Sequence, residues 1–332
     1  MNKVFFGDCR DTMRDLIAQG VRVQMCVTSP PYFGLRDYGH PGQLGLEATP
    51  AEFVRALVEV FGLVWEMLAD DGVLFLNLGD SYNGYMANQR GTGLEAGRQH
   101  SRKYIEPGAG LRTSTLKNKD LIGIPWRVAF ALQEAGWYLR QDIIWHKPNP
   151  MPESVTDRCT KAHEYLFLLS KSERYYFDQK AILEPVSANT HARLSQNVQA
   201  QIGSERANGG AKTNGNMKAV GRKFDPGAGN KNNPSFDAAM AIMPDERNKR
   251  SVWTVPTMPY SGAHFATFPP ALIEPCILAG SRSGDTVLDC FFGSGTTGEV
   301  AGNLGRNWIG CEINDQYAPL QQARTAQRGL AL

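Results

Sequence analysis

The sequence predicts an α/β fold in which a mostly parallel sheet carries helices on both faces. Segments with the composition of strands alternate with segments of helical periodicity through the first half of the chain and again near its C-terminus. Such alternation is typical of β-α-β units, whose strands run parallel. With 332 residues, of which 42% are hydrophobic and 20% charged, the chain can form one large domain that carries an insertion, or at most two domains.

The N-terminal half supplies most of the predicted sheet. A helix is expected to begin at Thr49, because Thr49 can cap it, Pro50 suits the first turn and Glu52 completes a capping box. Asp70-Asp71-Gly72 is expected to end this helix before the next strand. A second helix is expected over Leu121–Glu134, and strands are expected over Val4–Phe6, Arg22–Val27, Val73–Leu78, Leu139–Trp145 and Tyr165–Leu169.

A glycine-rich turn lies between a strand and a helix near the C-terminus, at Asp289–Thr297. Glycine lets the backbone approach a ligand closely, and a helix N-terminus offers free N–H groups to a carboxylate or phosphate. Glu312 ends the following strand, where a carboxylate can accept from both hydroxyls of a ribose. The expected elements here are the strand Thr286–Phe291, the helix Thr296–Leu304, the strand Trp308–Ile313 and the helix Asp315–Gln327.

The turn alone leaves two cofactors open, because Gly293, Gly295 and Gly298 also satisfy the dinucleotide pattern G-x-G-x-x-G. Position in the chain favours S-adenosylmethionine over NAD. A dinucleotide enzyme usually begins with this unit, whereas only 20 residues follow Glu312 here. Strands from the N-terminal half must therefore complete the sheet, in a circularly permuted order. Val4–Phe6 is expected in the adjacent position, which would place the Asp8 carboxylate beside the cofactor's adenine amino group.

The segment Thr28-Ser29-Pro30-Pro31-Tyr32 follows another predicted strand. Two consecutive prolines stiffen the backbone and remove two N–H donors. What remains is a row of acceptors, the Ser29 hydroxyl and backbone carbonyls, beside an aromatic ring that can stack on a flat base. An amino group needs such acceptors for its N–H protons while its lone pair turns toward an electrophile. In isolation the segment could be a simple turn, but the glycine-rich turn in the same chain favours a catalytic role.

Together, Thr28–Tyr32 and Asp289–Thr297 resemble the motifs of the amino-methyltransferases of bacterial DNA modification, in the subgroup whose catalytic motif precedes its cofactor motif. The resemblance implies a Rossmann-like, S-adenosylmethionine-dependent methyltransferase fold. It also implies site-specific methylation of the exocyclic amino group of a base flipped from double-stranded DNA. The likeness covers most of Met1–Arg174 and Ser251–Gln327, and further matching segments are Leu76–Asp80, Ile144–Pro148, His264–Pro269 and Gly310–Glu312.

The resemblance assigns two sets of site residues and no metal. The expected catalytic residues are Ser29, Pro30, Pro31 and Tyr32. The expected S-adenosyl-L-methionine-binding residues are Asp8, Cys9, Thr28, Phe265, Thr267, Phe268, Asp289, Phe291, Gly293, Ser294, Gly295, Thr296, Thr297 and Glu312. Family members with serine before Pro-Pro-Tyr are more often cytosine-N4 enzymes, so cytosine N4 is favoured as the target, with adenine N6 as the alternative.

Two basic segments interrupt the α/β pattern and are hidden by the formal net charge of +2. Asn83–Ser114 has five basic and two acidic residues, and Ser187–Arg250 has ten basic and five acidic ones. Such segments are either solvated and disordered or ordered by a polyanion. By the resemblance, residues 186–250 form a flexible target-recognition insertion. Residues 1–185, with a basic loop over 83–114, form the catalytic part of the methyltransferase domain, and residues 251–332 form its cofactor-binding part.

The expected partners are double-stranded DNA and, within a restriction–modification system, a cognate restriction endonuclease. Six cysteines without a C-x-x-C pair argue against a zinc site and against a secreted disulfide framework. Neither a signal peptide nor a membrane-spanning run is apparent, so a cytoplasmic protein without a membrane partner is expected. Monomer and homodimer both remain open.

Rival interpretations stay open at this point. Pro275-Cys276 could supply the nucleophile of a carbon-5 cytosine methyltransferase, although Ala271–Ala279 has the composition of a buried helix. An NAD-dependent oxidoreductase and a non-catalytic DNA-binding protein are the others. His146-Lys147 and His163-Glu164 lack a third spaced ligand for a metal, which favours contacts within the fold or with the DNA backbone.

Overall fold

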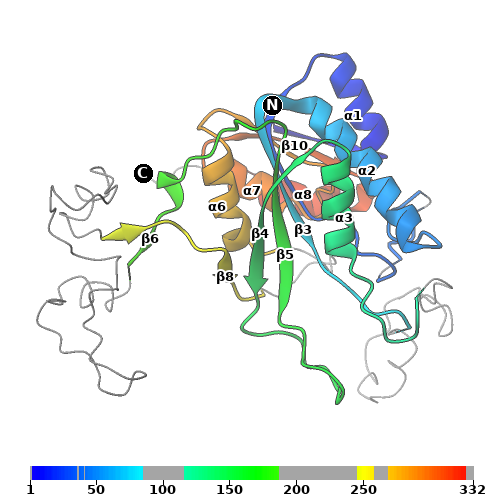
Figure 1. Cartoon of the computed structure of the whole chain (residues 1–332). Helices are drawn as coiled ribbons and strands as arrows, with labels where there is room; N and C mark the ends of the chain where they lie inside the picture. Colours follow the sequence, from blue (N-terminus) through cyan, green and yellow to red (C-terminus); the bar gives the residue numbers. More distant parts are fainter. Residues whose placement is uncertain are drawn as a thin grey trace, which may run out of the picture. The chain divides into compact units, whose positions relative to one another are not determined.

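The computed structural model describes residues 2–35, 37–40, 42–84, 116–186, 245–257 and 268–326. The chain divides into two compact units, Met1–Ala181 with Arg250–Leu332, and Ile182–Lys249. The larger unit holds an eight-stranded sheet in the order β1-β10-β9-β2-β3-β5-β4-β8 (Figure 1). In the smaller unit, the described residues include a two-stranded antiparallel ribbon of β6 (Glu184–Pro185) and β7 (Glu246–Arg247).

Most neighbouring strands of the large sheet run parallel, as predicted. Parallel pairing joins β1 to β10, β10 to β9, β9 to β2, β2 to β3, and β4 to β8. Among the described strands of this sheet, β5 alone runs antiparallel to its neighbours, β3 and β4. The strands are β1 (Asn2–Phe6), β2 (Val23–Thr28), β3 (Leu68–Leu78), β4 (Tyr138–His146), β5 (His163–Ser170), β8 (Val252–Thr254), β9 (Thr286–Asp289) and β10 (Asn307–Glu312).

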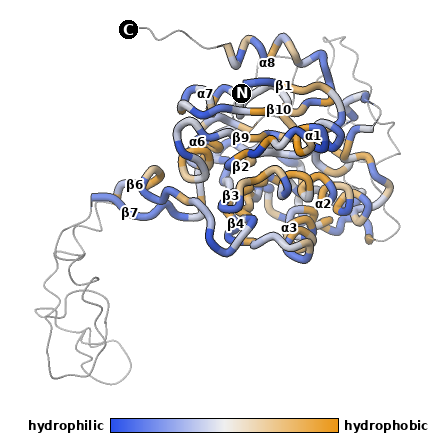
Figure 2. The backbone as a smooth tube through the Cα atoms, turned by 90° about the horizontal axis from the view of Figure 1, so that it is seen from above, coloured by the Kyte–Doolittle hydropathy of each residue, from blue (hydrophilic) through white to orange (hydrophobic). Residues whose placement is uncertain are grey.

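Helices cover both faces of this sheet. Helices α1, α2 and α3 lie on one face, and α6 and α7 lie on the other, with α8 beside α7 (Figures 1 and 2). Short 3₁₀ helices span Lys180–Ile182 and Asp315–Tyr317. The α-helices are α1 (Cys9–Ala18), α2 (Pro50–Met67), α3 (Ile124–Glu134), α6 (Pro270–Gly280), α7 (Thr296–Asn303) and α8 (Ala318–Thr325).

Strand β3 shows how the two faces are filled. Leu74 and Leu76 pack with the helices α1 to α3, whereas the alternate residues Val73 and Phe75 pack with α6, and all four are buried. A strand that is covered on both faces has a nearly continuous apolar sequence, as Val73–Leu78 does apart from Asn77. Each such side chain contributes about 1.5–3 kcal/mol by burial.

The predicted circular permutation is present in the sheet. Strand β1 lies parallel to β10, with Phe6 opposite Glu312, so the two ends of the chain complete one edge of the sheet. This pairing brings Gly7 and Asp8 to the same end of the sheet as Glu312, and the Gly7 N–H donates to the Glu312 carbonyl at 2.8 Å.

Some predicted boundaries were wrong. Asp70-Asp71-Gly72 does not separate α2 from the next strand, because β3 already begins at Leu68, directly after the helix. Leu68 is buried opposite Val23, and a register shift between Val23 and Met25 accommodates the extra residues of β3. Helix α1 was not predicted, and the expected helix over Asp315–Gln327 begins as a 3₁₀ turn.

The capping box predicted for α2 is present, and its contribution can be measured. The Thr49 hydroxyl accepts from the Glu52 N–H at 3.2 Å, and the Glu52 carboxylate accepts from the Thr49 N–H at 3.0 Å. We expect Thr49→Ala to lower the free energy of unfolding by about 1 kcal/mol in urea denaturation, because a first-turn N–H loses its acceptor. Thr49→Ser keeps the hydroxyl and is the control; equal stability of the two variants would contradict the expectation.

Candidate active site

A cavity of about 820 Å³ lies at the carboxyl ends of the parallel strands. Ser29 follows β2, Asp289 ends β9, Glu312 ends β10 and Asp8 follows β1, and all four residues line the cavity. Ligands of open α/β sheets bind outside these strand ends, where the loops diverge. The catalytic and glycine-rich motifs, which are far apart in the sequence, therefore share one cleft.

Most residues of the predicted site line this cavity. Thr28 and Thr297 are buried behind its wall, and Gly295 precedes α7 as its N-cap. Phe265 and Thr267 lie outside the described residues. The predicted residues that line the cavity are Asp8, Cys9, Ser29, Pro30, Pro31, Tyr32, Phe268, Asp289, Phe291, Gly293, Ser294, Thr296 and Glu312.

The Asp289 carboxylate joins the two motifs. It accepts from the Thr28 hydroxyl at 2.5 Å, from the Thr297 hydroxyl at 2.6 Å and from the Phe291 N–H at 3.0 Å. Burial raises the pKa of Asp289 to about 6, and the hydrogen bonds from the two threonines oppose that rise. Because three donors of the protein occupy this carboxylate, its visible role is to hold the end of β2 against the glycine-rich turn.

Helix α8 supports the glycine-rich turn from outside. Gly293 and Gly295 have φ angles of 53° and 91°, a backbone region that favours glycine. The Gln321 amide donates to the Gly293 carbonyl at 2.7 Å, and Arg324 donates to the Ser294 hydroxyl at 2.6 Å. The turn is thus held in one shape, with the N-terminus of α7 at the cavity, where free N–H groups favour an anion.

Glu312 presents a desolvated carboxylate to the cavity. Its oxygens accept from the Gly293 N–H at 2.7 Å and the Asn314 N–H at 2.9 Å, and the residue is only 8% exposed. Burial raises the pKa of Glu312 to about 7, although the two backbone hydrogen bonds lower it. In the described part of the chain no cation pairs with this carboxylate, so neutral hydroxyl donors such as those of a ribose suit it.

Asp8 differs from Glu312 because its carboxylate is paired with a cation and its pKa is lowered. It caps α1 by accepting from the Arg10 N–H at 2.8 Å, and it pairs with the Arg10 guanidinium at 2.5 Å. The hydrogen bond from the Arg10 side chain lowers the pKa of Asp8, while burial acts against it. Asp8 therefore stays an ionised acceptor at the cavity wall. The same cap also explains why α1 begins at Cys9, a signal that was available in the sequence.

Among the polar cavity residues that were not assigned to the site from the sequence, three form a hydrogen-bonded group with Tyr32. They are Asn77 near the end of β3, Lys147 directly after β4, and Glu164 in β5. Asn77 and Lys147 lie in segments that carried the family resemblance, but no role followed from their spacing. Among the described residues no group of three or more His, Cys, Asp or Glu side chains is arranged to hold a metal ion.

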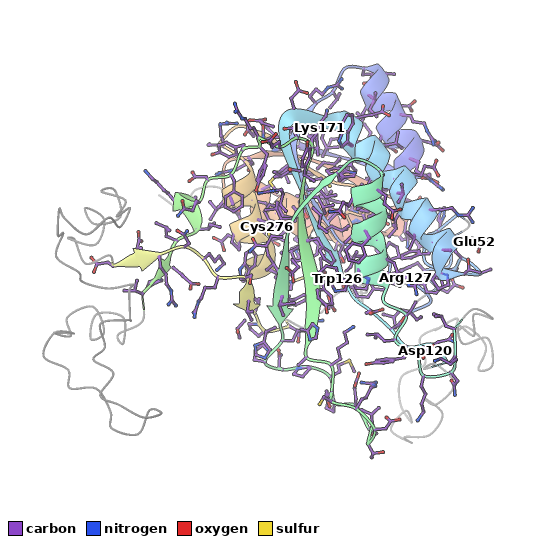
Figure 3. All side chains as sticks on the ribbon, viewed as in Figure 1. Glu52, Asp120, Trp126, Arg127, Lys171 and Cys276 are labelled. Carbon is purple, nitrogen blue, oxygen red and sulfur yellow. The ribbon has the colours of Figure 1, made fainter. Side chains whose placement is uncertain are left out.

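Cys276 lies in the core and not at the cavity. It is fully buried in α6, the helix on which Figure 3 labels it, and its thiol donates to the Leu272 carbonyl at 3.5 Å. A nucleophile for carbon-5 methylation must reach the base, and this thiol lines no part of the cavity. The geometry therefore does not support the carbon-5 interpretation.

Comparison with known proteins decides the family. Residues 23–323 match the model of the DNA methylase family of N6 and N4 type. The chain belongs to this DNA methylase family. The resemblance of the two motifs is thereby confirmed, and the oxidoreductase interpretation is set aside.

Several relatives of this DNA methylase match nearly its whole length. The type II methyltransferase M.SmaI of Serratia marcescens is 41% identical, over 98% of this chain and 91% of the relative. The type II methyltransferase M.Cfr9I of Citrobacter freundii is 42% identical, over 96% of this chain and 85% of the relative. The chain is therefore a DNA methyltransferase of the same type II group.

Solved structures of DNA methyltransferases share the fold of this DNA methylase. The cytosine-N4-specific PvuII DNA methyltransferase has a TM-score of 0.57 at 17% identity, covering 99% of this chain and 88% of that one. A putative DNA modification methylase of Thermus thermophilus, complexed with S-adenosyl-L-methionine, has a TM-score of 0.55 at 20% identity, covering 100% of this chain and 98% of that one. The predicted methyltransferase fold is confirmed. None of the helices in the described part of the chain is long and apolar enough to cross a membrane.

The junction at Asp289 can be tested by a nearly isosteric substitution. Thr28→Val removes one hydroxyl donor from a buried carboxylate, so we expect the free energy of unfolding to fall by about 1–3 kcal/mol in urea denaturation. Thr28→Ser, which retains the hydroxyl, should lose less. A valine variant that is as stable as the serine variant would show that the bond between Thr28 and Asp289 is unimportant.

Proposed function

We propose that this DNA methylase transfers a methyl group from S-adenosyl-L-methionine to the exocyclic N4 of a cytosine at a specific site in double-stranded DNA. The observation that carries the proposal is the shared cavity, which the acceptor row beginning at Ser29 and the glycine-rich turn at Gly293 both line. One cavity that holds a methyl donor beside an amino group is what direct methyl transfer requires.

The residues on one side of the cavity fit S-adenosyl-L-methionine. Glu312, a carboxylate without a cation partner in the described structure, suits the two ribose hydroxyls, and Asp8 suits the adenine amino group. The N-terminus of α7 suits the carboxylate of the methionine end. Phe268 lines the cavity and would flank that end together with Phe265 and Thr267. When bound, the cofactor supplies a methyl carbon that its sulfonium makes electrophilic.

The residues on the other side of the cavity suit an amino group. The base is flipped from the duplex at a cost of a few kcal/mol and enters beside Tyr32. The Ser29 hydroxyl and the Pro30 carbonyl accept from the amino N–H groups, which reduces conjugation with the ring and turns the nitrogen lone pair toward the methyl carbon. The amino nitrogen is then placed to receive the methyl group that a bound cofactor would supply, and the proton that the nitrogen gives up would pass to solvent through the Ser29 hydroxyl. Catalysis is by positioning and electrostatics.

The proposed target base and the proposed DNA contacts are inferred from the sequence. Serine before Pro-Pro-Tyr supports cytosine N4, and adenine N6 is the alternative. Residues 186–250 form the target-recognition insertion, whose basic side chains contact phosphates, and residues 1–185 and 251–332 form the methyltransferase domain. The relatives named type II methyltransferases support a cognate restriction endonuclease as partner.

The proposed reaction is tested by expressing the chain in a host without DNA methylation and analysing its DNA nucleosides by mass spectrometry. N4-methylcytosine is the expected product. N6-methyladenine instead would select the alternative target, and absence of both would contradict the proposed function. Sequencing of the modified positions would then give the recognition site.

Substitutions in the acceptor row should separate catalysis from DNA binding. We expect Ser29→Ala and Tyr32→Ala to lower the methylation rate by about 100-fold or more, since each removes a group that positions the amino nitrogen, while the Kd for DNA stays near that of the wild type. Cys276→Ala is the control and should keep its activity. Unchanged methylation in both acceptor-row variants would defeat the catalytic assignment.

Cofactor affinity should depend on pH through Glu312. The ionised carboxylate accepts from both ribose hydroxyls, and its pKa is raised to about 7. Affinity for S-adenosyl-L-methionine should therefore weaken as pH falls through 7, by about tenfold between pH 8 and pH 6 in titration calorimetry. Glu312→Gln should bind more weakly and without this dependence.

The free protein should show the opposite trend in stability. Because the pKa of Glu312 is higher in the folded than in the unfolded chain, the folded state holds the extra proton between about pH 4.5 and 7. The contribution of Glu312 to stability therefore declines as pH rises through this range.

In the binding experiment, cofactor affinity that is equal at pH 6 and pH 8 in the wild type would exclude Glu312 from the ribose site.

A further inference from the structure

An ion pair between Lys147 and Glu164 lines the cavity beside Tyr32, and the reaction as proposed does not use it. Glu164 lies in β5, opposite Trp145 of the antiparallel strand β4. Lys147 stands two residues beyond Trp145 and so emerges on the same face. Both side chains are largely buried, with 18% of Lys147 and 13% of Glu164 exposed.

Glu164 connects this pair to the catalytic motif. One carboxylate oxygen, Oε1, accepts from the Lys147 ammonium. The other, Oε2, accepts from the Tyr32 hydroxyl at 2.5 Å and from the Asn77 amide at 3.3 Å. The Asn77 amide also donates to the Tyr165 carbonyl at 3.1 Å, which ties the group to the backbone of β5.

The charge of the pair determines the direction of the tyrosine hydrogen bond. A buried carboxylate is costly unless it is paired, and Lys147 supplies the opposite charge while lying 4.3 Å from the centre of the Trp145 ring. An ionised Glu164 can only accept, so the Tyr32 hydroxyl must donate to it. Burial, followed by the nearby Glu164 charge, raises the pKa of Tyr32 well above its ordinary value, so the phenol keeps its proton.

The ring of Tyr32 is restrained at three places. Pro30 and Pro31 stiffen the backbone that leads to it, and Glu164 holds its hydroxyl. The ring itself lies against Gly79, where an added Cβ would come within 2.4 Å of the Tyr32 Cε2 atom. A hydrogen bond with the Ser29 side chain acts in the opposite direction to burial and lowers the pKa of Tyr32. A change at Glu164 would therefore reach the acceptor row through a single hydroxyl group.

We propose that Glu164 is a positioning residue for methyl transfer, which fixes the ring of Tyr32 and, through it, Ser29, while Lys147 balances its charge. The inference rests on the proposed function, because Tyr32 and Ser29 are the residues that hold the amino group there. It assigns a role in the reaction to a strand, β5, that neither of the two sequence motifs includes.

A double-mutant cycle tests the proposal. Glu164→Gln keeps the shape but removes the charge, and Tyr32→Phe keeps the ring but removes the hydroxyl. Each single variant should lower kcat by about 10- to 100-fold, because a small misplacement of reacting groups is costly, with KM for S-adenosyl-L-methionine changed by less than about twofold. The double variant should be no slower than the slower single variant, within about twofold, because Tyr32→Phe already removes the hydroxyl through which residue 164 acts on the ring.

A control is available in Asp285, which directly precedes β9, at the opposite end of that strand from Asp289, and lines no part of the cavity. Its carboxylate accepts from the Arg282 N–H at 2.7 Å, and its side chain is 26% exposed. Asp285→Asn removes a partly buried negative charge and should leave kcat at the wild-type value. A loss in this control equal to that in Glu164→Gln would overturn the specific role of Glu164.

Multiplicative losses in the double variant, or a wild-type kcat in Glu164→Gln, would also overturn the proposal. If Glu164→Gln is too unstable to assay, Tyr32→Phe decides alone, since a wild-type kcat there shows that the hydroxyl link is not needed. Failure of the proposed function gives a different result, because the unmodified protein would then methylate no DNA at all.

Discussion

The hydrogen bonds accepted by the buried Asp289 carboxylate are the interactions on which the rest of the site depends. Its bonds to Thr28 and Thr297 join residues 261 and eight positions away in the chain, and they bring the end of β2 to the glycine-rich turn. The pairing of β2 with β9 brings the two strand ends together, and this junction then holds the acceptor row against the cofactor turn. The rate of a methyl transfer without a covalent intermediate depends mainly on the distance and orientation of the reacting groups.

Among the other carboxylates that line the cavity, Asp8, Glu164 and Glu312 differ in what surrounds them, and the differences suit different roles. Asp8 is paired with Arg10 and stays ionised, and Glu164 is paired with Lys147 and holds a tyrosine. Glu312 is buried, with backbone N–H groups as its hydrogen-bond donors, so its pKa lies near neutrality. A ligand with two hydroxyl donors suits Glu312, because no cation pairs with this carboxylate in the described part of the chain.

Sequence reasoning succeeded where a local physical signal existed. The capping box at Thr49, the adjacent prolines at Pro30 and Pro31 and the glycines at Gly293 and Gly295 each restrict the backbone within a few residues, and each was found. Helix α1 was missed although Asp8 is a good cap, because that residue had been interpreted only as a cofactor contact. The start of β3 was wrong because Asp70-Asp71-Gly72 looks like a turn locally, whereas pairing with β2 extends the strand to Leu68.

The sequence by itself determined the sheet type, the permuted order of its strands, the two motifs and hence the family. These depend on periodicity, on glycine and proline, and on order along the chain. Only the tertiary structure decided that Glu164 holds Tyr32 from 132 positions away, that Lys147 balances its charge and that Cys276 is buried in the core. The reason is physical, because hydrogen-bond partners and burial depend on which strands lie side by side. The local sequence around each of these residues gives no signal of such a long-range contact.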